Sequence, residues 1–106
     1  MAWIYLLIAG IMEVVWSTTM KLSEGFSVLS YSIVTIVGML ASTIFLGLAI
    51  KTLPLGLAYP IWTGIGALGA IIVGVVLFHD TLSPQAWFFV ALLLIGLIGL
   101  KITSGH

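Results

Sequence analysis

Four long apolar segments, separated by short polar ones, constrain this chain more than any other feature of its sequence. Of its 106 residues, 62% are hydrophobic and 6% are charged, too little charge to cover the surface of a small soluble domain. The segments span residues 3–21, 28–50, 54–78 and 84–102, and each is close to the ~20 residues with which a helix crosses ~30 Å of hydrocarbon. They lack the alternation of a membrane β-barrel. The sequence therefore predicts one all-α integral membrane domain over residues 1–106, with four transmembrane helices.

The segment nearest the N-terminus is interpreted as a retained helix rather than a cleaved signal peptide. No basic residue precedes Trp3, and no small-residue cleavage pattern follows the apolar run. A carboxylate, Glu13, also interrupts the run.

The composition excludes several classes of function. The formal net charge is zero and arginine is absent, so a nucleic-acid partner is not expected. Without cysteine there are no disulfides or thiolate metal sites. His79 and His106 lack the spacing of metal ligands. We expect no enzyme activity and no cofactor.

The lysines give the helices little preferred orientation. Lys21 falls on one side of the membrane, and Lys51 and Lys101 fall on the other. The difference of one cation is a weak positive-inside bias. The sequence thus permits insertion in either orientation.

Glu13 is the principal candidate for function. It follows Trp3 by ten residues, which places it roughly 15 Å deep at 1.5 Å per residue. A charge at that depth costs about 2.5–3.5 kcal/mol on insertion scales, and intramembrane acids usually mark ion or proton pathways. We predict a site that exchanges protons for a cation. The simpler alternative is a neutral glutamic acid that hydrogen-bonds a neighbouring helix.

Residues at helical spacing share the face of Glu13. Ala9 and Ser17 lie four positions away, and Trp16 lies three positions away. The indole N–H of Trp16 needs an acceptor inside the membrane, and Glu13 is the nearest one. Packing alone is the alternative explanation for Trp16.

The third segment holds a second cluster. Tyr59 and Trp62 lie three apart on one face and offer an O–H, an N–H and two π faces to a cation. Gly64 and Gly66 permit bending or close helix approach, and Pro60 removes one backbone hydrogen bond.

Two further groups of residues are candidates for contacts between helices. Ser42 lies nearest the middle of the second segment, and we select it among the second-segment hydroxyls to reach Glu13. Gly96 and Gly99 in the fourth segment allow close backbone approach and predict a helix–helix contact.

Together these residues resemble a known family along essentially the whole chain. The shared residues are Ala9-Gly10 and Glu13, Lys21 with Ser23-Glu24-Gly25-Phe26, Leu53-Pro54-Leu55-Gly56, and Ala58-Tyr59 followed by Ile61-Trp62-Thr63-Gly64-Ile65-Gly66. The set resembles the small multidrug resistance family of four-helix, proton-coupled exporters of the inner (plasma) membrane.

The resemblance implies an antiparallel, dual-topology homodimer in which two copies of Glu13 form one site for protons and a small organic cation. It implies that Trp62 and Tyr59 line and gate the site, and that Ser42 hydrogen-bonds Glu13. We assign Ala9, Gly10 and Ser17, which adds a polar group to the Glu13 face, to a secondary pocket. The resemblance further implies a kink at Gly64-Ile65-Gly66 and a main dimer contact through the fourth helix, where we place Gly96 and Gly99.

Within the family, the chain looks most like the guanidinium exporters. The matching runs are Glu13-Val14-Val15-Trp16, Trp62-Thr63-Gly64-Ile65-Gly66-Ala67 and Gly99-Leu100-Lys101. Quaternary-ammonium exporters carry a small residue where Trp16 stands. A guanidinium ion presents paired N–H donors to a carboxylate, which a quaternary ammonium ion does not.

Other residues keep two alternatives open. The run Ser17 to Phe26 is closer to the multidrug branch, and Leu57 and Pro60 replace the threonine and alanine usual around Tyr59 in guanidinium exporters. One alternative is a broader exporter of quaternary ammonium compounds. The other is one subunit of a heterodimeric exporter, which the weak lysine bias disfavours.

Overall fold

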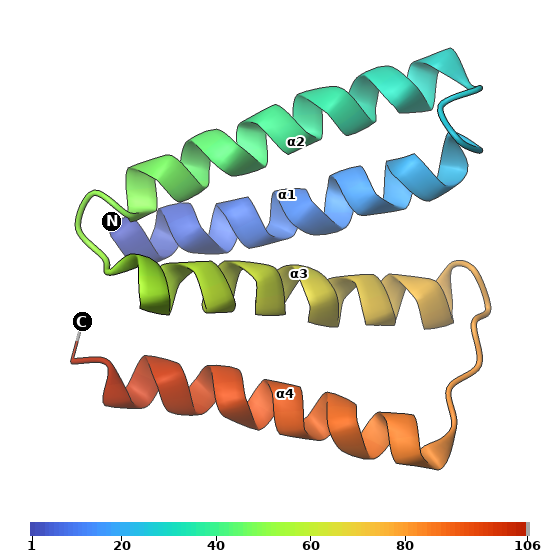
Figure 1. Cartoon of the computed structure of the whole chain (residues 1–106). Helices are drawn as coiled ribbons and strands as arrows, with labels where there is room; N and C mark the ends of the chain where they lie inside the picture. Colours follow the sequence, from blue (N-terminus) through green and yellow to red (C-terminus); the bar gives the residue numbers. More distant parts are fainter. Residues whose placement is uncertain (106) are drawn as a thin grey trace.

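The computed structural model describes residues 1–105, which form four α-helices joined by short loops (Figure 1). The helices are α1 (Ala2–Leu22), α2 (Leu29–Ala49), α3 (Leu55–Val76) and α4 (Pro84–Thr103). All four are long and apolar enough to cross a membrane. The predicted all-α membrane fold is therefore confirmed, and the last residue of the predicted domain, His106, lies outside the described residues.

The helix ends follow local chemistry. The side chain of Ser83 accepts a hydrogen bond from the backbone N–H of Ala86 at 3.2 Å, and Pro84 begins α4, as capping and proline preferences predict. The third helix ends at Val76, two residues before the predicted end at 78. After it the backbone turns: the N–H of Asp80 returns to the carbonyl of Gly74 at 2.9 Å.

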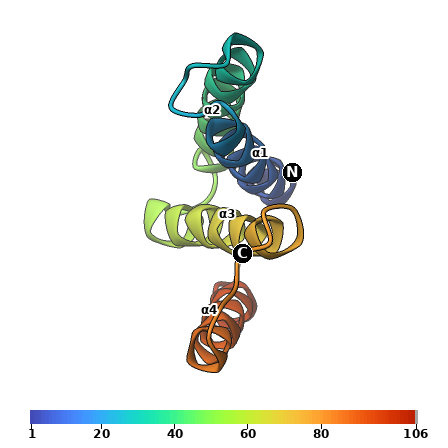
Figure 2. The same cartoon turned by 90° about the vertical axis from the view of Figure 1, so that its right-hand side faces the viewer.

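The helices are arranged nearly in a single layer. Figures 1 and 2 show the spatial order α2, α1, α3, α4, and the principal extents are 43 × 35 × 16 Å. The first helix packs against both α2 and α3, whereas the backbone of α4 approaches only that of α3. The first helix is thus the central element, with α4 at one margin.

The apolar core lies where α1, α2 and α3 meet. Its buried hydrophobic residues include Leu6 and Ala9 of α1, Leu46 of α2 and Ile61 of α3. In the described chain α4 contributes no buried residue. Most large apolar side chains face outward, as expected for a protein whose solvent on the flanks is lipid.

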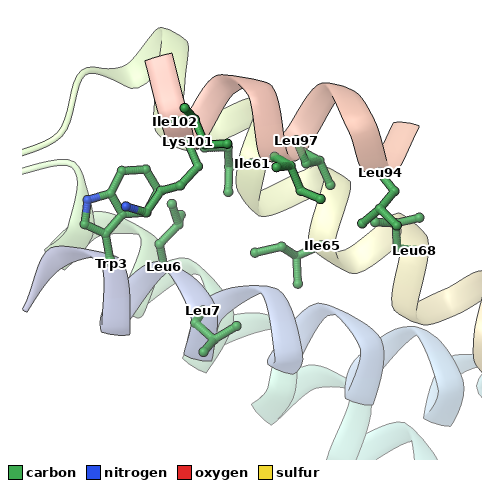
Figure 3. Close-up of a pocket in the computed structure, with 11 residues that line it drawn as sticks. Trp3, Leu6, Leu7, Ile61, Ile65, Leu68, Leu94, Leu97, Lys101 and Ile102 are labelled. Atoms are coloured by element: carbon green, nitrogen blue, oxygen red, sulfur yellow. The ribbon is translucent and has the colours of Figure 1, made fainter. Parts of the chain in front are cut away.

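An apolar groove of about 410 Å³ separates α4 from α1 near the chain termini (Figure 3). Lys101 at its mouth places its Nζ 4.3 Å from the ring centroid of Trp3, within cation–π range. Its other lining residues are apolar: Leu6, Leu7, Ile61, Ile65, Leu68, Leu94, Leu97, Ile98 and Ile102. The groove separates the C-terminal half of α4 from the core formed by α1, α2 and α3.

Both ends of the described chain lie at the same end of the helices, next to the α2–α3 loop (Figure 1). The α1–α2 and α3–α4 loops lie at the opposite end. Lys51 and Lys101 therefore share one end and Lys21 occupies the other, the distribution that the sequence predicted.

Candidate functional site

Glu13 lies near the middle of α1, eleven residues after Ala2 and nine before Leu22. At 1.5 Å per residue it is about 13–16 Å from either end of the helix. Its side chain is half-buried, between α1 and its two neighbours. The carboxylate thus lies halfway along a helix that is long and apolar enough to cross a membrane.

Trp16 holds one oxygen of this carboxylate. One helical turn after Glu13, its indole Nε1–H donates to Glu13 Oε1 at 2.7 Å. The distance lies at the short end of the range for an N–H···O hydrogen bond. Because both residues belong to α1, this bond forms within a single helix.

Ser42 of α2 connects three groups at this point. Its hydroxyl is fully buried and lies 2.8 Å from the carbonyl oxygen of Ala9 and 3.1 Å from Glu13 Oε1. It also accepts a bond from the indole Nε1–H of Trp62 at 2.9 Å. A serine has one proton to donate, so Ala9 and Glu13 share it.

Trp62 and Tyr59 form the α3 side of the site. Their rings meet edge to face, with centroids 5.3 Å apart and an interplanar angle of 63°, a favoured aromatic geometry. Tyr59 as a whole residue is 51% exposed. The indole N–H of Trp62 bonds Ser42, and Ser42 in turn bonds Glu13. The hydrogen bonds therefore link Trp62 of α3 to the carboxylate through a side chain of α2.

Close approach of α3 to α1 depends on glycines. A Cβ added at Gly66 would lie 2.8 Å from Glu13 Cβ, and one added at Gly10 would lie 2.8 Å from Ile65 Cβ. Real Cβ atoms essentially never come this close. A side chain at either position would therefore push the helices apart beside Glu13.

Gly64 has a different neighbour. A Cβ there would collide with the side chain of Leu97, so the glycine at 64 allows α4 to pack closely against α3. The third helix continues without interruption through Pro60, Gly64 and Gly66. The helix-three kink stays a prediction for this chain.

Ser17 is not brought to the carboxylate. Its hydroxyl donates to the carbonyl of Val14 in its own helix at 3.1 Å, the common state of serines in membrane helices. It also lines a hollow toward the Lys21 end of α1, about 180 Å³ in volume, with Lys21 and Asp80.

Gly96 and Gly99 contact nothing that would explain them in the single chain. A Cβ at either position meets no atom of residues 1–105 within 4 Å. Their role in a dimer contact stays a prediction, and the backbone at both positions is open to a second copy.

Sequence reasoning missed two pairs between α1 and α2. The hydroxyls of Thr19 and Thr35 lie 2.7 Å apart, and a Cβ at Gly38 would lie 2.9 Å from Trp16 Cβ. Thr35 and Gly38 precede Ser42 by seven and four positions, so helical spacing from Ser42 was the available sign of this face.

Glu13 has no cationic partner within the described part of the chain. The three lysines lie at exposed positions at the ends of the helices or in a loop. Lys21 lies over the ring of Phe78 at 5.9 Å and Lys101 over that of Trp3. With neutral donors on one oxygen, the carboxylate can take up a proton or an external cation.

Comparison with known proteins identifies the family of this chain. The family model described as Small Multidrug Resistance protein matches residues 1–93. Proteins named "Guanidinium exporter" from Salmonella typhimurium and Yersinia pseudotuberculosis are each 50% identical over 104 residues, covering 98% of this chain and 99% and 100% of their own lengths. The "Guanidinium exporter" of Escherichia coli K12 is 46% identical over the same length, covering 98% of this chain and 99% of its own. The predicted resemblance to this branch is confirmed, and the chain belongs to the small multidrug resistance family of multi-pass membrane proteins.

Proposed function

We propose that this protein is a proton-coupled antiporter that exports guanidinium and small substituted guanidinium ions. Glu13 carries the proposal, because its carboxylate sits at mid-membrane with neutral donors and without a cation among residues 1–105. Protons and substrate compete for this carboxylate, and alternating access moves each across the membrane in opposite directions. The full-length relatives named guanidinium exporters support the choice of substrate.

The hydrogen bonds favour a planar cation with paired donors. Both bonds from Trp16 and Ser42 reach Oε1 of Glu13, so Oε2 is the oxygen open to a ligand. A guanidinium edge donates in parallel to both oxygens of a carboxylate. Ser42 keeps the carbonyl of Ala9 as an acceptor and so can release Oε1 when substrate arrives.

The aromatic residues of α3 complete the proposed pocket. Tyr59 is about half exposed, and the indole N–H of Trp62 donates a hydrogen bond to Ser42. Their faces attract a desolvated cation. Trp62 is linked to the carboxylate through Ser42. Binding of a proton or a cation to Glu13 therefore changes the hydrogen bonds that reach α3, the helix proposed to bend.

The proposed working unit is an antiparallel homodimer in which two copies of Glu13 face one cavity. The weak lysine bias of the sequence permits it, and the outward Gly96 and Gly99 supply small residues for a contact through α4.

The decisive experiment is exchange in proteoliposomes that contain a pH-sensitive dye. Guanidinium added outside should drive protons out of the lumen, and Glu13→Gln should abolish this flux. Glu24→Gln, at an exposed loop carboxylate, is the matched control and should keep it. Guanidinium-driven proton movement that persists in Glu13→Gln would overturn the mechanism. Proton movement with tetrapropylammonium and none with guanidinium would select the quaternary-ammonium alternative.

A further inference from the structure

Gly38 of α2 is buried directly against the base of Trp16. A Cβ added at Gly38 would lie 2.9 Å from Trp16 Cβ, 3.5 Å from its Cα and 3.6 Å from its backbone nitrogen. The nearest atoms belong to the backbone and the first side-chain carbon. Rotation of the indole ring therefore does not relieve the contact, and only a shift of the two helices does.

Hydrogen bonds on both sides of Gly38 oppose such a shift. Three residues before it, Thr35 bonds Thr19 at 2.7 Å. Four residues after it, Ser42 reaches Glu13 at 3.1 Å. A wider α1–α2 spacing would lengthen one or both bonds, and the second belongs to the proposed site.

We propose that Gly38 is a positioning residue that sets substrate selectivity through Trp16. By letting α1 lie close against α2, it allows Trp16 and Ser42 to donate to the same oxygen of Glu13. The other oxygen is then presented to a compact planar cation. The inference rests on the proposed function and extends it to a residue that touches neither proton nor substrate.

The Cβ atoms of residues 16 and 38 would occupy the same space between α1 and α2. A side chain at residue 16 requires glycine at 38, whereas glycine at 16 would leave room for a Cβ at 38. Trp16→Ala does not create that room, because alanine keeps the Cβ atom that lies 2.9 Å away. Only Trp16→Gly removes the crowded atom. This difference separates a specific pairing from general crowding.

The first test compares Gly38→Ala with Gly47→Ala. Both glycines lie in α2, and a Cβ at Gly47 meets no atom of the described chain within 4 Å. We expect Gly38→Ala to raise the KM for guanidinium at least tenfold, with a smaller effect on the KM for tetrapropylammonium. Gly47→Ala should match the parent protein for both ions.

A spectroscopic measurement excludes a merely structural effect. The indole N–H resonance of Trp16, assigned by its loss in Trp16→Phe, should move in Gly38→Ala and stay in place in Gly47→Ala. An unmoved resonance, or equal changes in KM for both cations, would overturn the inference.

The second test covers a Gly38→Ala protein that folds poorly. Gly38→Ala should lower the Tm in detergent when residue 16 is tryptophan or alanine, and leave it unchanged in a Trp16→Gly background. Equal losses of Tm in the Trp16→Ala and Trp16→Gly backgrounds would refute the pairing. These outcomes are independent of Glu13→Gln, whose continued exchange would refute the proposed function itself.

Discussion

Ser42 shows how much of the site depends on one hydroxyl group. It has one proton, two acceptors in Ala9 and Glu13, and one donor in Trp62. The Ser42 oxygen of α2 therefore connects two groups of α1, the Ala9 carbonyl and the Glu13 carboxylate, with the Trp62 indole of α3. No apolar residue reproduces this arrangement, because each of the groups would lose its partner inside a medium without water.

Ser42→Ala should weaken guanidinium binding. The change removes a donor to Glu13 and leaves the indole N–H of Trp62 without its acceptor. An unsatisfied buried group costs about 1–3 kcal/mol, or roughly tenfold to a hundredfold in affinity. Isothermal titration in detergent measures the effect.

Thr43→Ala is the matched control, since the Thr43 hydroxyl bonds only the carbonyl of Met39 in its own helix. Affinity in Thr43→Ala should stay within a factor of about two of the parent, because an exposed substitution changes little. Equal losses in both variants would show that Ser42 contributes nothing specific.

The sequence was sufficient to select Glu13 and Trp16, because their spacing lies within one helix and helical geometry determines it. It also pointed to Ser42 through its depth in α2. The contact of Gly38 with Trp16 was not predicted, although Gly38 lies one helical turn before Ser42 in the sequence. The role of a glycine depends on the atoms that lie opposite it. Those atoms depend on how α2 is rotated against α1, which the sequence of neither segment determines alone.

Among the elements, α3 has glycines that serve two different neighbours. Gly64 faces Leu97 of α4, whereas Gly66 faces Glu13 and Gly69 faces Val14 of α1. The third helix therefore packs closely against both α1 and α4 at positions where it has no side chain. Small residues do this in membranes because helix association there relies on close packing.

Gly66→Ala should impair exchange by displacing α3 from Glu13. A Cβ at this position lies 2.8 Å from Glu13 Cβ, and such overpacking typically costs about 1–3 kcal/mol. Both the Tm and guanidinium-driven proton flux should fall. Gly56→Ala is the control in the same helix, since a Cβ there has no neighbour within 4 Å among residues 1–105. Flux in Gly66→Ala equal to that in Gly56→Ala would contradict the contact.

Gly99→Leu should reduce dimerisation while leaving the single chain folded. Within the described chain, a Cβ at Gly99 meets no atom within 4 Å, so a larger side chain there has room. In the proposed dimer the same side chain separates the two copies. Cross-linking in liposomes should show fewer dimers, with helix content by circular dichroism unchanged. An undiminished dimer population would exclude Gly99 from the contact.

The existence of the four helices was predictable because hydrocarbon thickness fixes their length. Their ends agree with the predicted ranges within about two residues, the usual uncertainty at helix termini. The order α2, α1, α3, α4 was not predictable, because lipid and helix faces are equally apolar. Pairs such as Ser42 with Glu13 decide which helices meet.

At the scale of the whole molecule, the chain is a layer 16 Å thick whose fourth helix buries no residue within the described structure. Its four helices thus leave large apolar surfaces to lipid or to another copy. This shape agrees with the proposal that a second copy closes the site.

Reporters fused to the C-terminus should detect both orientations in the membrane. One lysine on one side and two on the other give almost no positive-inside bias. A reporter active only in the cytoplasm and one active only outside should both give signal. Thr52→Arg adds a cation beside Lys51 in an exposed loop. It should move most chains to one orientation and lower exchange. A single orientation of the parent protein would contradict the antiparallel homodimer.

The shared location of the two chain ends limits how this gene can be duplicated. The first helix begins, and the fourth ends, at the same end of the helices. Two copies joined by a short polar linker would therefore insert in the same orientation. An antiparallel pair within one polypeptide would require a linker that itself crosses the bilayer, about 20 further apolar residues. Direct fusion of two copies through a short polar linker would therefore give a parallel pair in place of the proposed antiparallel one.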